Sequence, residues 1–400
     1  MEDVGTESSV AVDGLPLPRH LYDGYLVHRD AISRGLDVLL LPRQVLLAGV
    51  DSAVPAKLSF THGVPQSSTL SAVTFAQDRR LRRALFERRG VAKPTGASFS
   101  HRSLGRATRW AKSKGFPVSV KEAIGENDGR AIRHVNSPRE LDEAFTTLRV
   151  REESDRAPGS NPNISGYTTT RLTYVVDDQG RELAPTRTRM LIEKEPVGKA
   201  FRTFVVDGEV VGIVELSADG EVGEVVIIDT ANPGLTSAAT NAADAVPGLG
   251  FAMVDLTETR GRNPLRKPRY LVTELSERPR MASLSEKHPH LAERVAQRLL
   301  QAEARRGGVP LHDPVSVVKR TIRVDGLRDP ENAAAQAGDT YRAHGAQLDL
   351  KDVDPVMGSF MAVCEGPVAL VAALNEMLMS GDLIDDRAAA IEYVRENEGD

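Results

Sequence analysis

The sequence predicts a mixed α/β protein built from several domains. Its 400 residues exceed what one hydrophobic core usually organises. Apolar patterns typical of helices and of strands alternate along the chain, and the final segment has a β-α-β-β-α succession of its own. We expect an N-terminal α/β domain over residues 1–76, a central domain over residues 77–310 and a C-terminal domain over residues 311–400.

Composition and charge exclude several classes of protein. The net charge of −5 provides no basic surface for nucleic acid, and aromatic residues make up only 4% of the chain. The single cysteine, Cys364, rules out a disulfide framework and a cysteine-based zinc site. No apolar run approaches the roughly 20 residues of a membrane helix, and the acidic N-terminus does not resemble a secretory signal. We expect a cytoplasmic protein with no nucleic-acid or membrane partner.

The N-terminal segment predicts a helix over residues 23–36 followed by strands within residues 37–50 and 56–63. The run DVLLLP is short and lies between Gly35 and Pro42, which favours a buried strand. We expect a helix between parallel strands, with no glycine-rich phosphate loop.

The central segment opens with a helix capped by Asp78 and ended by Gly90. Ser137 and Glu140 form the capping box of a later helix. Residues 152–167 are rich in Gly, Pro, Ser and Asn, which is typical of a flexible loop or lid. Further helices are expected over residues 102–115, 237–248 and 290–306, and strands over residues 116–123, 171–178 paired with 187–195, 201–216 as a hairpin, 250–256 and 269–276.

The C-terminal segment predicts a ferredoxin-like plait, in which two helices cover one face of an antiparallel sheet. The expected strands are residues 315–326, 346–354 and 359–367, and the expected helices are residues 330–345 and 368–381.

Several charged residues lie at positions where strands end or turn. Glu193 ends an apolar strand, a turn through Pro196 and Gly198 follows, and Arg202 lies on the next strand. Taken alone, this pattern is also that of an ordinary hairpin with a cross-strand ion pair. Two earlier basic residues complete the series: Arg79 at the start of a helix, where a solvated basic face is the alternative, and Lys121 at the end of a strand, where a purely structural role is the alternative.

In this order and spacing, the motifs from residue 77 to 301 resemble the ATP-grasp family. The resemblance is to its carboxylate–amine ligases, such as cyanophycin synthetase and D-alanine–D-alanine ligase. It implies an ATP-grasp fold for the central domain, with Arg79 in the place of a phosphate-binding lysine and Lys121 contacting the α- and β-phosphates. It also implies that the loop from Gly125 to Gly129 closes over the phosphates.

The same resemblance assigns the hinge of a nucleotide site. Glu193 matches the acid that ends the adenine-contacting strand, and Arg202 matches the residue that steadies the γ-phosphate or the acyl-phosphate oxyanion. Ala200 replaces the acid that many relatives use to bind ribose, which leaves Glu195 as the candidate for that contact.

The metal ligands of the family match Asp255 and Glu274. Magnesium prefers hard oxygen ligands, and an Asp and a Glu on adjacent strands can bridge ions to phosphates. Ser276 stands where the family has asparagine, and Arg278 matches a substrate-side arginine, while Arg280 replaces a glycine. The resemblance implies ATP and Mg²⁺ as cofactors.

The implied activity is ATP-dependent ligation of a carboxylate to an amine through an acyl phosphate, with release of ADP and phosphate. An amino acid or a peptide is the expected substrate class, and a homodimer is left open. The changes at Ala200 and Ser276 keep an alternative open, a degenerate ATP-grasp module that binds nucleotide without catalysis and serves as a regulatory partner. A third hypothesis is transfer of the ATP phosphoryl group to an acceptor other than a carboxylate. Lys121→Ala and Glu274→Ala are each expected to abolish turnover and leave the fold intact, because neither side chain is expected to fill a core.

Overall fold

The computed structural model divides the chain into two compact units, one made of residues 1–67 and 278–400 and one of residues 68–277. Within the described residues, no helix is long and apolar enough to cross a membrane. The structure describes residues 9–49, 57–124, 131–154, 175–176, 182–183, 189–218, 220–259 and 269–394.

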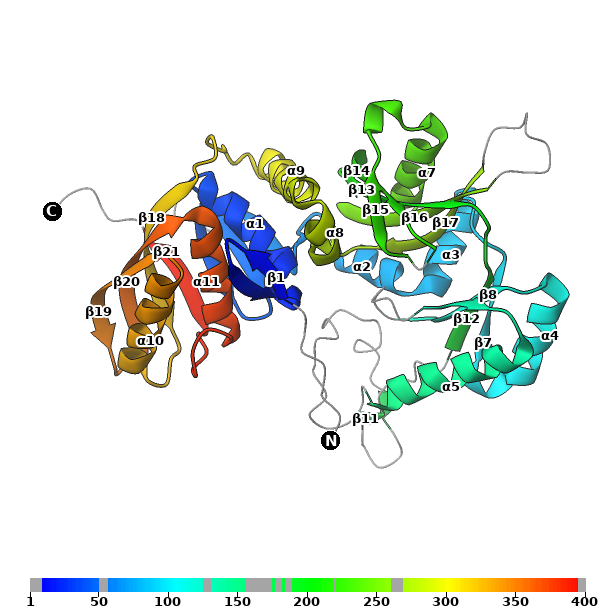
Figure 1. Cartoon of the computed structure of the whole chain (residues 1–400), viewed down its shortest axis with the longest axis horizontal. Helices are drawn as coiled ribbons and strands as arrows, with labels where there is room; N and C mark the ends of the chain where they lie inside the picture. The colour runs from blue at the N-terminus through cyan, green and yellow to red at the C-terminus, as the bar shows by residue number, and fades with distance from the viewer. Residues whose placement is uncertain are drawn as a thin grey trace. The chain divides into compact units, whose positions relative to one another are not determined.

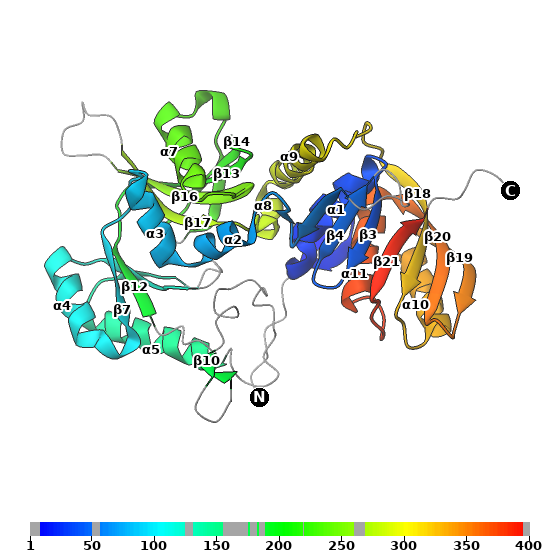
Figure 2. The ribbon, with the colours of Figure 1, turned by 180° about the vertical axis from the view of Figure 1, so that it is seen from behind.

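The first unit is organised around one eight-stranded sheet to which both ends of the chain contribute. The strand order is β19-β20-β18-β21-β3-β4-β5-β6, and every neighbouring pair is antiparallel. Figure 2 shows the N-terminal strand β3 beside the C-terminal strand β21. The strands are β3 (Asp37–Leu41), β4 (Val45–Gly49), β5 (Leu58–Thr61), β6 (Val64–Pro65), β18 (Val317–Asp325), β19 (Gln347–Asp354), β20 (Ser359–Pro367) and β21 (Ala390–Val394), with a separate hairpin of β1 (Ser9–Val12) and β2 (Leu15–Pro18).

Five α-helices accompany this sheet in the described part of the unit. Helices α10 and α11 pack on β19 and β20, and α1 packs on both α11 and α9. Figure 1 shows α10 and α11 in front of the orange and red strands. The helices are α1 (Tyr22–Ser33), α8 (Met281–Lys287), α9 (Pro289–Gly307), α10 (Pro330–Ala343) and α11 (Val368–Ser380).

The predicted parallel arrangement of the N-terminal strands is wrong. β3 and β4 form an antiparallel hairpin in which Val38 faces Ala48. Only three residues join these strands, which is far too short for the crossover that a parallel pair requires. Arg43 and Gln44 make the reversal with φ angles of 68° and 53°.

The C-terminal segment has the predicted β-α-β-β-α succession and one further strand, β21. This strand pairs with β18 on one side and with β3 on the other. Residues 311–400 therefore share a sheet with the N-terminal strands. The division into two units differs from the three consecutive domains expected from the sequence, because strand pairing joins segments that lie more than 300 residues apart.

The second unit contains two further antiparallel sheets. The smaller has the order β7-β12-β8-β9 and the larger β15-β14-β13-β16-β17. Their strands are β7 (Gly96–Ser100), β8 (Val118–Glu122), β9 (Ile132–Val135), β12 (Arg189–Lys194), β13 (Lys199–Val206), β14 (Glu209–Leu216), β15 (Val222–Val225), β16 (Phe251–Thr259) and β17 (Arg269–Ser276), beside a short pair of β10 (Val175–Val176) and β11 (Glu182–Leu183).

Each sheet of the second unit packs on helices through an apolar core of its own. One core joins the smaller sheet to α4 and α5 through residues such as Ala107, Val120 and Leu148. The other joins the larger sheet to α2, α3 and α7 through residues such as Phe86, Ala239 and Val254. The helices are α2 (Leu70–Gln77), α3 (Arg79–Arg88), α4 (Leu104–Lys114), α5 (Pro138–Ser154) and α7 (Pro233–Asp244).

Local signals placed the helix starts of this unit well. Asp78 caps α3 by accepting from the backbone N–H groups of Arg80 and Leu81 at 2.9 and 3.4 Å. Ser137 accepts from the Glu140 N–H at 3.2 Å, and the Glu140 carboxylate accepts from the Ser137 hydroxyl at 3.0 Å. Among the described residues, the predicted pairing of residues 171–178 with 187–195 is not found: β12 is flanked by β7 and β8, and β10 pairs with β11.

A buried chain of polar side chains crosses the core of the first unit. His28 bonds Glu376 at 3.1 Å through Nδ1 and the Tyr393 hydroxyl at 3.0 Å through Nε2. Asn375 donates to the same hydroxyl at 2.6 Å and accepts from Tyr341. All five residues are at most 3% exposed, so their hydrogen bonds offset the cost of burying polar groups.

Cys364, beside this chain, is expected to be unreactive in the native protein. Its thiol is buried and donates to the Arg320 carbonyl at 3.3 Å, and burial raises its pKa to about 12. Because the thiolate is the reactive form, a disulfide reagent at pH 8 should label no thiol in buffer and one thiol per chain in urea. Rapid labelling of the native protein, followed spectrophotometrically, would contradict this burial.

Candidate functional site

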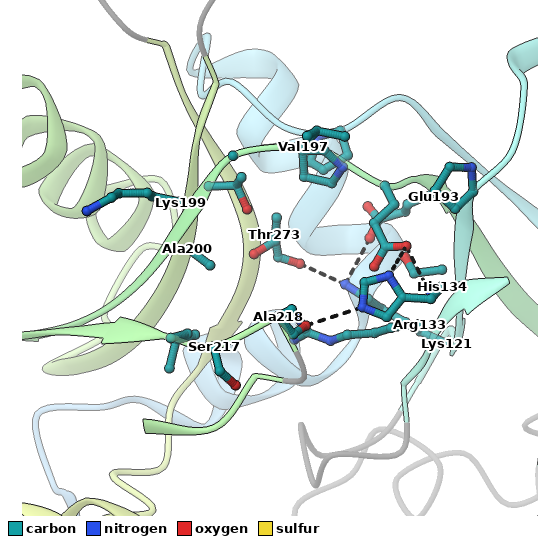
Figure 3. A pocket seen from close by; sticks show the side chains of 18 residues that line it. Lys121, Arg133, His134, Glu193, Val197, Lys199, Ala200, Ser217, Ala218 and Thr273 are labelled. Atoms are coloured by element: carbon teal, nitrogen blue, oxygen red, sulfur yellow. Dashed lines mark hydrogen bonds and ion pairs between the residues drawn. The ribbon is translucent and has the colours of Figure 1, made fainter. Parts of the chain in front are cut away.

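A cavity of about 310 Å³ lies in the second unit where its two sheets face each other. Figure 3 shows side chains from both sheets pointing into it. Lys121 and Glu193 come from the smaller sheet, and Ala200 and Thr257 come from the larger one. The segment from Glu195 to Lys199, which joins β12 to β13, forms one wall.

Lys121 joins the two sheets at the inner side of the cavity. Its Nζ lies 2.9 Å from Oε2 of Glu193 on β12 and donates to the Thr273 carbonyl of β17 at 2.8 Å. Glu193 faces Ser119 in the antiparallel ladder with β8, so its side chain is held beside Lys121 by strand register. Glu193 is also paired with Arg83 of α3. A cation and a carboxylate are therefore fixed at one edge of the cavity.

Glu274 on β17 is the most heavily paired carboxylate of this region. Its Oε2 lies 3.2 Å from Arg79 Nε and 3.4 Å from Lys121 Nζ, and its Oε1 accepts from Arg82 Nη2. Burial alone would raise the pKa of Glu274, but the attraction of Arg79, Arg82 and Lys121 outweighs burial and holds this pKa well below its ordinary value. Glu274 is thus a buried, ionised carboxylate that joins α3, β8 and β17.

Arg202 and Asp255 form a second pair, on the larger sheet. They are directly opposite in the β13–β16 ladder, and the guanidinium donates through Nε and Nη2 to both carboxylate oxygens at 2.8 and 2.9 Å. Burial acts to lower the pKa of Arg202, but the attraction of Asp255 outweighs burial and raises this pKa above its ordinary value. The cross-strand ion pair named as the alternative for Arg202 is therefore present.

The Arg202–Asp255 pair continues the sheet face that lines the cavity. Ala200 faces Thr257 in the same ladder, and residues two apart on a strand point to the same side. Asp255 in turn faces Glu274 in the β16–β17 ladder. The Arg202–Asp255 pair therefore lies next to the cavity residues Ala200 and Thr257 on the larger sheet, and Glu274 lies beside Asp255 on the following strand.

The segment from Glu195 to Lys199, which we call the hinge, places Glu195 against His134 of β9. Glu195 accepts from the His134 N–H at 3.0 Å and lies 3.3 Å from its Nδ1, while the other ring nitrogen lies 3.3 Å from the Ala218 carbonyl. A Cβ at Gly198 would lie 1.7 Å from the Glu258 carbonyl, so only glycine allows the hinge to pass this close to β16. The chain has no acid at Ala200, and Glu195 is the carboxylate that the hinge supplies to the cavity.

The structure gathers most of the residues that sequence reasoning selected. Arg79, Lys121, Glu193 and Glu274 form one continuous ion-pair network, and Arg202 with Asp255 lies next along the sheet. Ser276 is buried on β17 and faces Met253. Arg278 belongs to the other compact unit, and its predicted role in binding substrate stays a prediction. Gly125, Gly129 and residues 155–167 of the predicted loop or lid (152–167) lie outside the described residues, whereas residues 152–154 form the end of α5.

Sequence reasoning missed Arg82, Arg83 and His134. Arg82 and Arg83 follow Arg79 at helical spacings of three and four, so they share its face of α3 and reach Glu274 and Glu193. That spacing was available in the sequence. His134 gave no such signal, because its contact with Glu195 depends on the pairing of β9 with β8.

The residues present do not fit a magnesium site. Magnesium takes about six oxygen ligands at roughly 2.0–2.1 Å. Both carboxylate oxygens of Glu274 and both of Asp255 already contact guanidinium or ammonium groups. Among the described residues there is also no group of three or more His, Cys, Asp or Glu side chains suited to a metal ion.

Comparison with known proteins gives matches only among solved structures. No family model and no curated protein matches the chain. It is similar over 60% of its length to 71% of D-alanine–D-alanine ligase from Bacillus anthracis, with a TM-score of 0.40 and 14% identity. It is similar over 78% of its length to 73% of N5-carboxyaminoimidazole ribonucleotide synthetase in its ADP complex, with a TM-score of 0.41 and 15% identity. Structural similarity at this low identity and TM-score does not assign a function to the chain, so its function depends on its own side chains.

A third match is a bifunctional glutathione synthetase from Pasteurella multocida. The similarity covers 71% of this chain and 43% of that protein, with a TM-score of 0.40 and 11% identity.

Glu274→Gln is expected to destabilise the fold, and Glu274→Ala to do the same. The structure contradicts the premise that Glu274 is dispensable to the core, because the residue is 4% exposed and its charge is shared by three cations. Breaking a buried ion pair by removing one partner costs about 3 kcal/mol or more. Urea unfolding should show a loss of this size.

The matched control is Glu215→Gln on β14, whose partly exposed carboxylate pairs with the exposed Lys199 at 3.1 Å. An exposed pair contributes less than about 1 kcal/mol, so this variant should unfold close to the wild type. Equal unfolding midpoints for Glu274→Gln and Glu215→Gln would show that the ion pairs of Glu274 do not stabilise the fold.

Proposed function

We propose that this chain is an ATP-dependent carboxylate–amine ligase of the ATP-grasp type. The observation that carries the proposal is the convergence of Lys121, Glu193 and Glu195 on one cavity. The Arg202–Asp255 pair continues from it along the same sheet face. The nucleoside part of ATP fits a cavity of about 310 Å³, and the basic residues beyond it suit a polyphosphate.

The charge balance of the region supports binding of a polyanion. The ion pairs of this network join five cations to three carboxylates in a mostly buried setting, and Glu195 adds a further carboxylate at the cavity. Anions are attracted more strongly there than at an exposed surface, because screening by water is weak. The cations are Arg79, Arg82, Arg83, Lys121 and Arg202, and the carboxylates are Glu193, Asp255 and Glu274.

In the proposed reaction, a substrate carboxylate oxygen attacks the γ-phosphorus of ATP and ADP leaves, which gives an acyl phosphate. An amine then attacks the acyl carbon, phosphate leaves, and the nitrogen loses a proton to give the amide. Negative charge builds on phosphoryl oxygens in the first step and on the acyl oxygen in the second. Lys121 and Arg202 are the cations that we assign to those charges, since fixed charges need no reorganisation as the reaction proceeds. An amino acid or peptide is the proposed substrate class.

A non-catalytic nucleotide-binding module is the second candidate. Two observations favour it: Arg202 is held in a two-point pair by Asp255, and both oxygens of Glu274 contact cations. In such a module, nucleotide binding would stabilise the fold, and the chain would act as a regulatory or assembly partner.

Lys121→Ala is expected to weaken nucleotide binding at least about tenfold, because a hydrogen bond to a charged group contributes about 1.5–3 kcal/mol. Glu193 and Glu274 each keep an arginine partner in this variant, so the fold should persist. Calorimetric titration with ADP measures the effect. Lys112→Ala, an exposed lysine on α4, is the matched control and should bind as the wild type does. Equal ADP affinity for Lys121→Ala and Lys112→Ala would show that Lys121 does not contact the nucleotide.

Turnover with Mg-ATP is expected to depend on added carboxylates and amines. ADP and phosphate release should rise when pools of amino acids and peptides are supplied, and an amide product should be detectable by mass spectrometry. ADP release with a phosphorylated product and no amide would indicate phosphoryl transfer to another acceptor. Nucleotide binding with no turnover on any pool would favour the non-catalytic module.

A further inference from the structure

We propose that Arg82 acts as a built-in cation on Glu274, so that this chain binds a nucleotide polyphosphate without help from a divalent metal ion. The proposal rests on the proposed function only in requiring that a nucleotide binds. It concerns Glu274 and Asp255, the carboxylates expected to bind metal, and it follows from their ion pairs with arginine and lysine side chains.

Arg82 is fixed against Glu274 by three acceptors. Its guanidinium donates to Glu274 Oε1, to the Leu275 carbonyl and, at 2.9 Å, to the Ala76 carbonyl. The residue is 5% exposed, although five of the other nine residues of α3 are exposed. A buried guanidinium with this many partners is held in place more firmly than a mobile surface arginine.

The remaining acceptor positions of Glu274 are also taken. Oε2 lies between Arg79 at 3.2 Å and Lys121 at 3.4 Å, and Oε1 also accepts from the Leu275 N–H at 3.4 Å. A divalent ion on either oxygen would lie close to two guanidinium groups and an ammonium group, all of the same sign as itself. Repulsion of this kind opposes metal binding even where an oxygen lone pair is geometrically within reach.

Asp255 offers no better position for a metal. Its two oxygens accept separately from Nε and Nη2 of Arg202, and its backbone carbonyl accepts from Thr273 Oγ1 at 3.1 Å. Ser276, two residues after Glu274 on β17 and opposite Met253, is a neutral hydroxyl and adds no negative charge. The cationic side chains therefore neutralise the two acids internally and still leave positive charge for phosphate oxygens.

The wild-type protein gives the first test. ADP is titrated into the full chain by calorimetry, once in excess EDTA and once with Mg²⁺. We expect binding in EDTA to be as tight as with Mg²⁺ or tighter, because free ADP carries more negative charge than its magnesium complex. Binding that is at least about tenfold weaker in EDTA would overturn the inference and leave nucleotide binding intact. Absence of ADP binding in both conditions would instead overturn the proposed function, and this inference with it.

Replacing Arg82 gives the second test. Arg82→Met removes the cation from Glu274 Oε1, so Mg²⁺ should now strengthen ADP binding by at least about tenfold relative to EDTA. Arg82→Lys keeps the charge and should remain insensitive to metal. Arg88→Met, an exposed arginine on the same helix, is the matched control and should behave as the wild type. No metal dependence in Arg82→Met would contradict the assignment of Arg82, and if this variant does not fold, the wild-type titration decides.

Discussion

A single buried carboxylate, Glu274, holds together the parts of the unit formed by residues 68–277. It lies on the larger sheet and is paired with a helix through Arg79 and Arg82 and with the smaller sheet through Lys121. Each of these cations is itself buried, so each depends on Glu274 for part of its compensation. Lys121 is held at the cavity by Glu274 together with Glu193 and the Thr273 carbonyl.

The ion pairs that stabilise this unit also set the charge of the cavity region. In a site designed around metal ions, acidic ligands repel one another until the metal binds. Here the acids are neutralised by side chains of the same chain, so the charges are already organised before any ligand arrives. Of the cations in this network, Lys121 lines the cavity, and its ion pairs with Glu193 and Glu274 hold its charge there.

The other unit shows a different kind of dependence, on chain topology. Its sheet places β3 next to β21, so the first and last parts of the sequence have to meet before the sheet is complete. The polar chain through His28, Asn375 and Tyr393 also joins these two ends inside the core. Contacts over such a separation are slow to form, and we expect this unit to complete its folding late.

The sequence by itself determined the local features of this protein. The caps at Asp78 and Ser137, the helices and strands of the C-terminal segment, and the order of Arg79, Lys121, Glu193, Arg202 and Asp255 follow from short-range signals. Only the tertiary structure decided which charges meet. Strand register set Arg202 opposite Asp255, and the packing of α3 against β17 turned Glu274 from an expected metal ligand into a partner of arginines. The antiparallel pairing of β3 and the joining of both chain ends in one sheet were also hidden, because the alternation of residues along a strand does not specify which distant strand it pairs with.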